Sequence, residues 1–157
     1  MMKSTIALSL ALLIIFPLRG CSLRDPKYIN INSKPSLSYY TEELKKDAEN
    51  DMTFKVSILD TNLYKEKEIP QAENTSFIKF LMAIKEDDYM NPSIDNSKNC
   101  IYKVFITFKS NKYLIKVYEN ETISVSPWDG VFQEDVLSEL SIMPGEKLIS
   151  ICRYYFK

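Results

Sequence analysis

The 157-residue sequence contains no histidine. Ser-His-Asp and Cys-His catalytic groups therefore cannot form, because imidazole is the general base in both. Zinc and iron sites that depend on imidazole ligands are excluded for the same reason. Many familiar hydrolase mechanisms and metal centres are thus ruled out from composition alone.

Glycine is nearly as scarce, with three in the chain: Gly20, Gly130 and Gly145. A phosphate-binding loop or a nucleophile elbow needs closely spaced glycines, so neither can be built. The chain also lacks a block of basic residues, whereas nucleic-acid-binding surfaces normally cluster Lys and Arg. We therefore expect no nucleic-acid partner, no metal site and no cofactor.

The longest apolar run lies at the start of the chain, from Ile6 to Phe16, after the basic start Met1-Met2-Lys3. It is too short for a membrane span, which needs roughly 20 apolar residues to cross ~30 Å of hydrocarbon. A basic start, an apolar run and a small residue before a cleavage point are typical of a secretory signal peptide. The sequence predicts that residues 1–20 are a signal peptide.

The segment Leu18-Arg19-Gly20-Cys21 resembles the lipobox of bacterial lipoproteins, in which leucine and two small residues precede a lipid-bearing cysteine. It departs from that pattern at Arg19. The resemblance implies that Cys21 carries a diacylglyceryl group and becomes the new N-terminus. Two acyl chains anchor a protein stably, whereas one binds a membrane only marginally. We expect a lipid-anchored protein on the extracytoplasmic face of the cell membrane; the alternative is an ordinary secreted protein in which Cys21 is incidental.

The remainder of the chain fits one domain preceded by a short tether. Residues 21–36 contain two prolines and several polar turn formers without periodicity, which favours a membrane-proximal tether. Residues 37–157 are long enough for a single domain with a working core. After cleavage the chain keeps 18 of the 20 bases and all 21 acids, a net charge of about −3.

Two helices and a hairpin are predicted in the first half of this domain. Residues 37–50 carry a thin apolar stripe, and residues 71–86 place Phe77, Phe80, Leu81 and Ile84 at helical spacing. Residues 52–58 alternate apolar and polar side chains, as a strand with one buried face does. Residues 63–69 return as a second strand, and their run of alternating Lys and Glu suits an exposed sheet edge.

Three strands in quick succession are predicted in the second half. The alternating runs are 100–108, 113–117 and 123–128, joined by short turns. Residues 87–99 form a polar loop, residues 131–141 are either a strand or a loop, and residues 148–155 are either a short helix or a strand. The expected fold is α+β: an antiparallel sheet of about five strands, a two-strand hairpin plus a three-strand meander, with helices packed on one face.

Cys100 and Cys152 are the cysteines that follow Cys21. Their spacing matches neither a metal site nor a Cys-x-x-Cys redox motif. One interpretation is a disulfide between the start of the meander and the C-terminal element, which an extracytoplasmic location permits. The other is two buried free thiols that pack as small hydrophobic groups.

Carboxylates form two groups along the chain, Asp87-Asp88 and Asp129 with Glu134 and Asp135. A pair of carboxylates beside Trp128, acting as a platform for sugars, is the pattern of a glycosidase. Turn chemistry for Asp129-Gly130 and a strand-end anchor for Trp128 are the plainer interpretation. No spacing matches a calcium-binding EF-hand loop.

Tyrosine is abundant, with ten in the chain. Under the elements predicted above, the partly exposed ones are Tyr39, Tyr64, Tyr89, Tyr118 and Tyr154. Exposed aromatic residues are enriched at binding surfaces, so Tyr64, Tyr118, Trp128 and Asp129 are candidates for a recognition surface. The alternative is that tyrosine serves here as a good strand former with a tolerant polar tip.

The stretches Leu59 to Glu66 and Ile123 to Gly130, with the sequence as a whole, resemble small clostridial-type lipoproteins grouped as a domain family of unknown function. The resemblance implies no activity and no catalytic residues. We expect a non-enzymatic binding or structural module whose partner is an envelope or surface protein or a glycan. The alternatives are a carboxylate-dependent envelope hydrolase, and an inhibitor of an envelope enzyme that presents the loop at residues 87–99.

Overall fold

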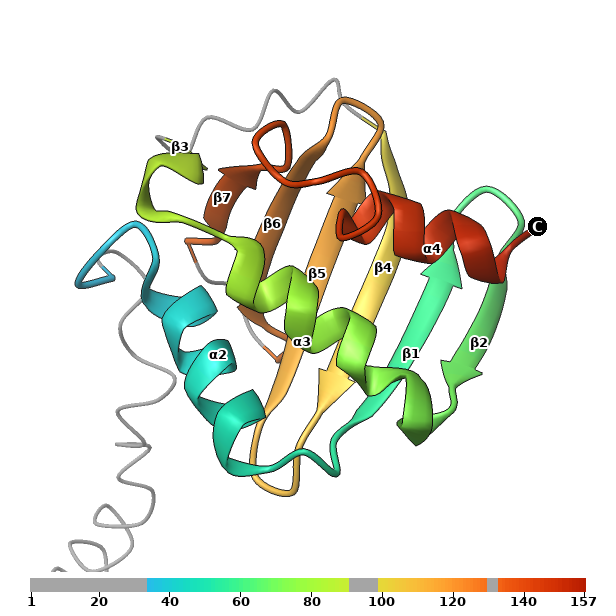
Figure 1. Ribbon diagram of the computed structural model, residues 1–157, viewed down its shortest axis with the longest axis horizontal. Helices are drawn as coiled ribbons and strands as arrows, with labels where there is room; N and C mark the ends of the chain where they lie inside the picture. Colours follow the sequence, from blue (N-terminus) through green and yellow to red (C-terminus); the bar gives the residue numbers. More distant parts are fainter. Residues whose placement is uncertain (1–33, 91–98, 130–132) are drawn as a thin grey trace, which may run out of the picture. The chain divides into compact units, whose positions relative to one another are not determined.

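A computed structural model of the protein describes residues 34–90, 99–129 and 133–157 (Figure 1). The predicted signal peptide, and Cys21 with most of the predicted tether, lie outside the described residues. The α-helices are α2 (Tyr39–Asn50), α3 (Asn74–Ala83) and α4 (Leu148–Tyr155). The strands are β1 (Lys55–Asp60), β2 (Lys65–Ile69), β3 (Tyr89–Met90), β4 (Cys100–Thr107), β5 (Lys112–Tyr118), β6 (Thr122–Pro127) and β7 (Asp135–Ser138).

These strands form one antiparallel sheet in the order β2-β1-β4-β5-β6-β7-β3. All three α-helices lie over one face of the sheet (Figure 1). The α+β class, the hairpin β1–β2 and the meander β4–β5–β6 are confirmed. Because β4 pairs with β1 rather than beginning a separate sheet, hairpin and meander share one core.

The sheet has seven strands, two more than the hairpin and meander that were predicted. One addition is β7, within a segment for which the sequence allowed either a strand or a loop. The other is β3, inside the predicted polar loop 87–99, of which residues 91–98 lie outside the described residues. A two-residue strand shows no periodicity in the sequence, and β3 is defined only by its long-range pairing of Tyr89 with Leu137.

The apolar side chains whose spacing predicts α3 are also the ones that hold it against the sheet. Phe77, Phe80 and Leu81 are fully buried against the sheet. The helix ends at Ala83, earlier than predicted, because Ile84 adopts an extended backbone while its side chain stays in the core. At the other end, the Asn74 side-chain amide donates to the Phe54 carbonyl oxygen at 2.6 Å, which ties the helix start to the strand side of the core.

The C-terminal segment is helical, which decides between the two predicted alternatives. Leu148, Ile151 and Cys152 form the buried stripe of α4. The N-terminus of α4 is capped from a distance, because the Leu148 backbone N–H donates to the carboxylate of Glu139. Glu139 has no exposed surface, and its second carboxylate oxygen has no hydrogen-bond partner within the described residues.

The buried Glu139 carboxyl is expected to make folding depend on pH. Burial raises its pKa to about 7, against an opposing effect of the α4 backbone N–H groups. The folded state therefore binds a proton at Glu139 more tightly than the unfolded state does. The stability that this proton binding contributes is complete below pH ~4 and is lost as pH rises through 7. Raising the pH from 5 to 8 should cost about 2–3 kcal/mol at this residue.

Urea unfolding at both pH values tests this, with Glu139→Gln as the matched variant. The glutamine keeps an acceptor for α4 but does not titrate, so its stability should fall by less between pH 5 and 8 than that of the wild type. Equal losses in the two proteins would contradict the assigned role of Glu139.

Candidate ligand-binding face

The face of the sheet opposite the helices carries side chains of both polar and aromatic character. Strand alternation sends Val56, Ile58 and Ile106 into the core, and their neighbours to the other side. We use "open face" for eight of the outward side chains in the region of β2, β1, β4, the start of β5 and the end of β6. They are Lys55, Ser57, Glu66, Glu68, Phe105, Thr107, Lys112 and Trp128.

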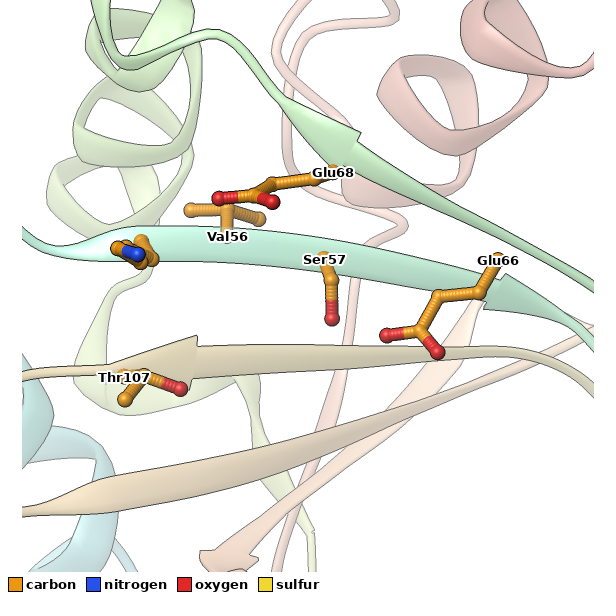
Figure 2. Close-up of a pocket in the computed structure, with 6 residues that line it drawn as sticks. Val56, Ser57, Glu66, Glu68 and Thr107 are labelled. Atoms are coloured by element: carbon orange, nitrogen blue, oxygen red, sulfur yellow. The ribbon is translucent and has the colours of Figure 1, made fainter.

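A shallow groove of about 430 Å³ lies on the open face, at the β2 edge. Its lining is Lys55, Val56, Ser57, Glu66, Glu68 and Thr107. In Figure 2 the Glu66 and Glu68 carboxylates reach from β2 over β1, with Ser57 between them. The register produces this set, because Ser57 lies opposite Glu68 and Lys55 lies opposite Thr107. Two carboxylates, two hydroxyl groups and one ammonium therefore meet in a single groove.

Neither groove carboxylate has an ion-pair partner within the residues that the structure describes. Glu66 and Glu68 lie on an exposed edge strand. Their oxygens can accept hydrogen bonds from a ligand without first breaking a protein ion pair. The sequence pattern predicted the exposed edge but not the groove, because the groove depends on the pairing of β1 with β4.

An aromatic and cationic cluster adjoins the groove. The Lys112 ammonium lies 4.0 Å from the centre of the Trp128 ring and 5.0 Å from that of Phe105, and the two rings meet edge to face at 5.8 Å. The Trp128 backbone N–H donates to the Lys112 carbonyl oxygen at 3.0 Å, which extends the β5–β6 ladder and fixes the indole beside β5. Phe105 lies across from Ser57 of the groove. Half of Trp128 is exposed, so the cluster presents aromatic surface at the groove margin.

The four predicted recognition residues do not gather on one surface. Trp128 and Asp129 follow β6 at the end of the sheet where β4 finishes, and both are exposed. Tyr64 is exposed but belongs to the β1–β2 turn, which the register places at the other end of the strands. Tyr118 was predicted to be exposed and is instead only 6% exposed. It faces away from the helices, and its burial raises the pKa of its phenol.

Three of the carboxylates considered for catalysis, Glu134, Asp135 and Asp88, are engaged in separate structural contacts. Consecutive residues of a strand point to opposite faces, and Glu134 and Asp135 accordingly form different ion pairs, with Lys116 and Lys34. Asp88 is buried and accepts hydrogen bonds from the Lys85 backbone N–H and the Ser141 hydroxyl. These three residues therefore stabilise the fold rather than flanking one cleft.

The ion pair of Lys34 with Asp135 is buried almost completely. The Lys34 Nζ lies 2.6 Å from the carboxylate, and the side chains are 5% and 0% exposed. The other carboxylate oxygen accepts hydrogen bonds from the Thr41 backbone N–H at 2.7 Å and its hydroxyl at 2.9 Å. Burial raises the pKa of Asp135, and the Lys34 and Thr41 contacts oppose that rise. Lys34, assigned to the tether by the sequence pattern, thus belongs to the domain and joins the start of α2 to β7.

In this structure Cys100 and Cys152 are free thiols, Cys100 half-buried and Cys152 buried. Cys100 lies opposite Tyr118 on the sheet, whereas Cys152 is on the buried stripe of α4. The sheet separates the two sulfurs, which a disulfide would have to bring close together. Burial raises the pKa of both thiols.

Neither a metal-binding cluster nor a membrane-spanning helix is present within residues 34–90, 99–129 and 133–157. No group of His, Cys, Asp and Glu side chains there could hold a metal ion. Likewise, none of the helices in those ranges has the length and apolar character needed to cross a membrane.

A family model described as "Domain of unknown function (DUF4883)" matches residues 34–152. The chain belongs to the DUF4883 family. The match begins at Lys34, whose ammonium is buried against Asp135, and ends at Cys152 on the buried stripe of α4. It therefore includes the groove and the Trp128 cluster of this DUF4883 domain.

Among solved structures, the DUF4883 domain is similar to a crystal structure described as that of a putative lipoprotein from Clostridium perfringens. The two share 32% sequence identity with a TM-score of 0.70, over 79% of this chain and 98% of that one. No protein with a curated description matches the sequence. The resemblance to uncharacterised lipoproteins of clostridial type is confirmed.

Proposed function

We propose that this DUF4883 protein is a lipid-anchored, extracytoplasmic binding module that holds an envelope glycan on its open face without chemical conversion. The observation that carries the proposal is the groove of Lys55, Ser57, Glu66, Glu68 and Thr107 beside the Trp128 cluster. The likeness to a protein described as a lipoprotein supports an anchor at Cys21, because a diacyl group holds a protein stably at a membrane.

The chemistry of the groove favours an extended polar ligand. Small-molecule pockets are usually enclosed and mostly apolar, whereas this groove is open and lined by carboxylate, hydroxyl and ammonium groups. Sugar hydroxyl groups can donate to Glu66 and Glu68 and accept from Lys55. The half-exposed Trp128 offers apolar surface for the C–H face of a sugar ring.

A carboxylate-dependent hydrolase is supported less well. The acids that could have accompanied Trp128 in catalysis include Glu134 and Asp135, which are each held in an ion pair. The inhibitor hypothesis depends on the loop at residues 87–99, most of which lies outside the described residues. Binding without chemistry uses only groups that the open face presents.

Titration of the isotope-labelled protein with soluble cell-wall glycan fragments tests the proposal. We expect amide shift changes at Ser57, Phe105 and Thr107, and we expect Trp128→Ala to weaken binding about 30-fold, the loss typical of a buried aromatic anchor. Lys79→Ala is the matched control, because Lys79 is an exposed residue of α3 on the helix side. Shift changes confined to the helices, or unchanged affinity in Trp128→Ala, would contradict the proposal.

A further inference from the structure

The edge strand β2 separates its charges by sign. Alternation along Lys65-Glu66-Lys67-Glu68 places both glutamates on the open face. The register places Lys67 opposite the core residue Ile58, so both lysines lie on the helix side of the sheet. The run that indicates an exposed edge in the sequence thus gives one acidic and one basic border in the fold.

The C-terminal residues extend the basic border. The Lys67 ammonium donates to the Tyr155 carbonyl oxygen and lies 5.3 Å from the centre of the Phe156 ring. Phe156 in turn stacks on Tyr102 of β4 at 5.8 Å. These contacts hold the end of α4 against β2, where Arg153 and Lys157 are exposed. Four cationic side chains therefore lie at one corner of the domain.

Exposed apolar side chains lie at the same corner. Leu63 and Tyr64 of the β1–β2 turn are 55% and 86% exposed, and Tyr154 is 66% exposed. Tyr64 also has a φ of 51°, a left-handed conformation that glycine or asparagine adopts at lower cost. Because Tyr64 is largely exposed, packing within the domain does not compensate for this strain. We use "basic corner" for Leu63, Tyr64, Lys65, Lys67, Arg153, Tyr154 and Lys157.

We infer that the basic corner rests on an anionic lipid surface. Tyrosine rings are favoured at the level of lipid headgroups, where one end is apolar and the other wet. Lysine and arginine side chains gain from the negative potential of anionic lipids, and Leu63 can enter the acyl boundary. The inference rests on the proposed lipid anchor at Cys21, which would hold the corner near the bilayer.

Chain length permits this contact. Lys34 is bound to β7, next to the sheet edge opposite β2, and strand spacing makes the sheet about 29 Å wide. The 13 residues from Cys21 to Ser33 can span at most about 43 Å. A lipid on Cys21 can therefore stay in the bilayer while the basic corner touches it.

Hydrogen exchange of the lipidated protein in two kinds of vesicle tests the inference. Vesicles of phosphatidylcholine alone and vesicles containing phosphatidylglycerol both accept the Cys21 lipid, so the comparison isolates the corner. We expect amides of residues 61–66 and 153–157 to exchange about tenfold more slowly on the anionic vesicles, with 0.5 M salt abolishing the difference. Residues 51–54 serve as the internal control, because Met52 is exposed at the other end of β1.

The variant Lys65→Glu with Lys67→Glu should lose the slowing, and Lys79→Glu on α3 should retain it. Equal exchange in both vesicle types, with the protein bound to both, would overturn the inference while leaving the anchor intact. Failure to sediment with either vesicle would contradict the anchor instead. Equal slowing by soluble polyphosphate on phosphatidylcholine vesicles would also overturn it, by assigning the corner to a wall polymer.

Discussion

Asp135→Ala should lower the free energy of unfolding by about 3–5 kcal/mol, the cost typical of removing one partner from a buried ion pair. The substitution leaves the Lys34 ammonium, whose side chain is 5% exposed, without its carboxylate. It also removes the acceptor of the Thr41 backbone N–H and hydroxyl, and buried donors without an acceptor are costly. Since Lys34 and Thr41 precede β7 by about a hundred residues, the start of the domain should loosen first.

Urea denaturation measures the loss, and two further variants separate charge from packing. Lys34→Met with Asp135→Leu removes both charges and should be clearly more stable than Asp135→Ala, because a buried pair can often be replaced by apolar groups at little cost. Glu134→Ala, one residue away, breaks the partly exposed pair with Lys116 and should cost about 1 kcal/mol or less. An Asp135→Ala protein within 1 kcal/mol of wild type would contradict the role assigned to the pair.

Elements whose burial is periodic along the chain were predictable. Phe77, Phe80 and Leu81 lie at helical spacing and are buried where α3 crosses the sheet. Tyr102, Val104 and Ile106 alternate and form the inner side of β4. In both cases the side chains that define the pattern are the ones that fill the core, so local sequence and tertiary packing agree.

Features that depend on distant pairing were not predictable. The strand β3 exists because Tyr89 pairs with Leu137. The sequence pattern assigns Lys34 to the tether, and only the fold brings Asp135 beside it. The sequence pattern predicts that Tyr118 is an exposed residue of a strand, although only 6% of it is accessible in the folded sheet. Each depends on a contact between residues far apart in sequence, and no local period encodes it.

The candidate site lies between these two cases. Trp128 was a candidate from its residue type, and its exposure beside Lys112 and Phe105 supports that choice. The sequence pattern identifies Glu66 and Glu68 only as charges that protect an edge strand, because the role proposed for them depends on which face of the sheet they share. Alternation alone could have assigned them to the side opposite Lys65 and Lys67, but not to the groove with Thr107 of β4.

The Cys21→Ala variant tests the lipid anchor on which both proposals depend. The wild type and the variant would be expressed in a Gram-positive host, separated into membrane and medium, and measured by intact mass. We expect the wild type in the membrane, at the mass of a diacylated chain beginning at Cys21. The Cys21→Ala variant should show no such lipidated form. If both proteins appear in the medium, unlipidated and cleaved at the same position, Arg19 has abolished lipobox processing, and the anchor is contradicted.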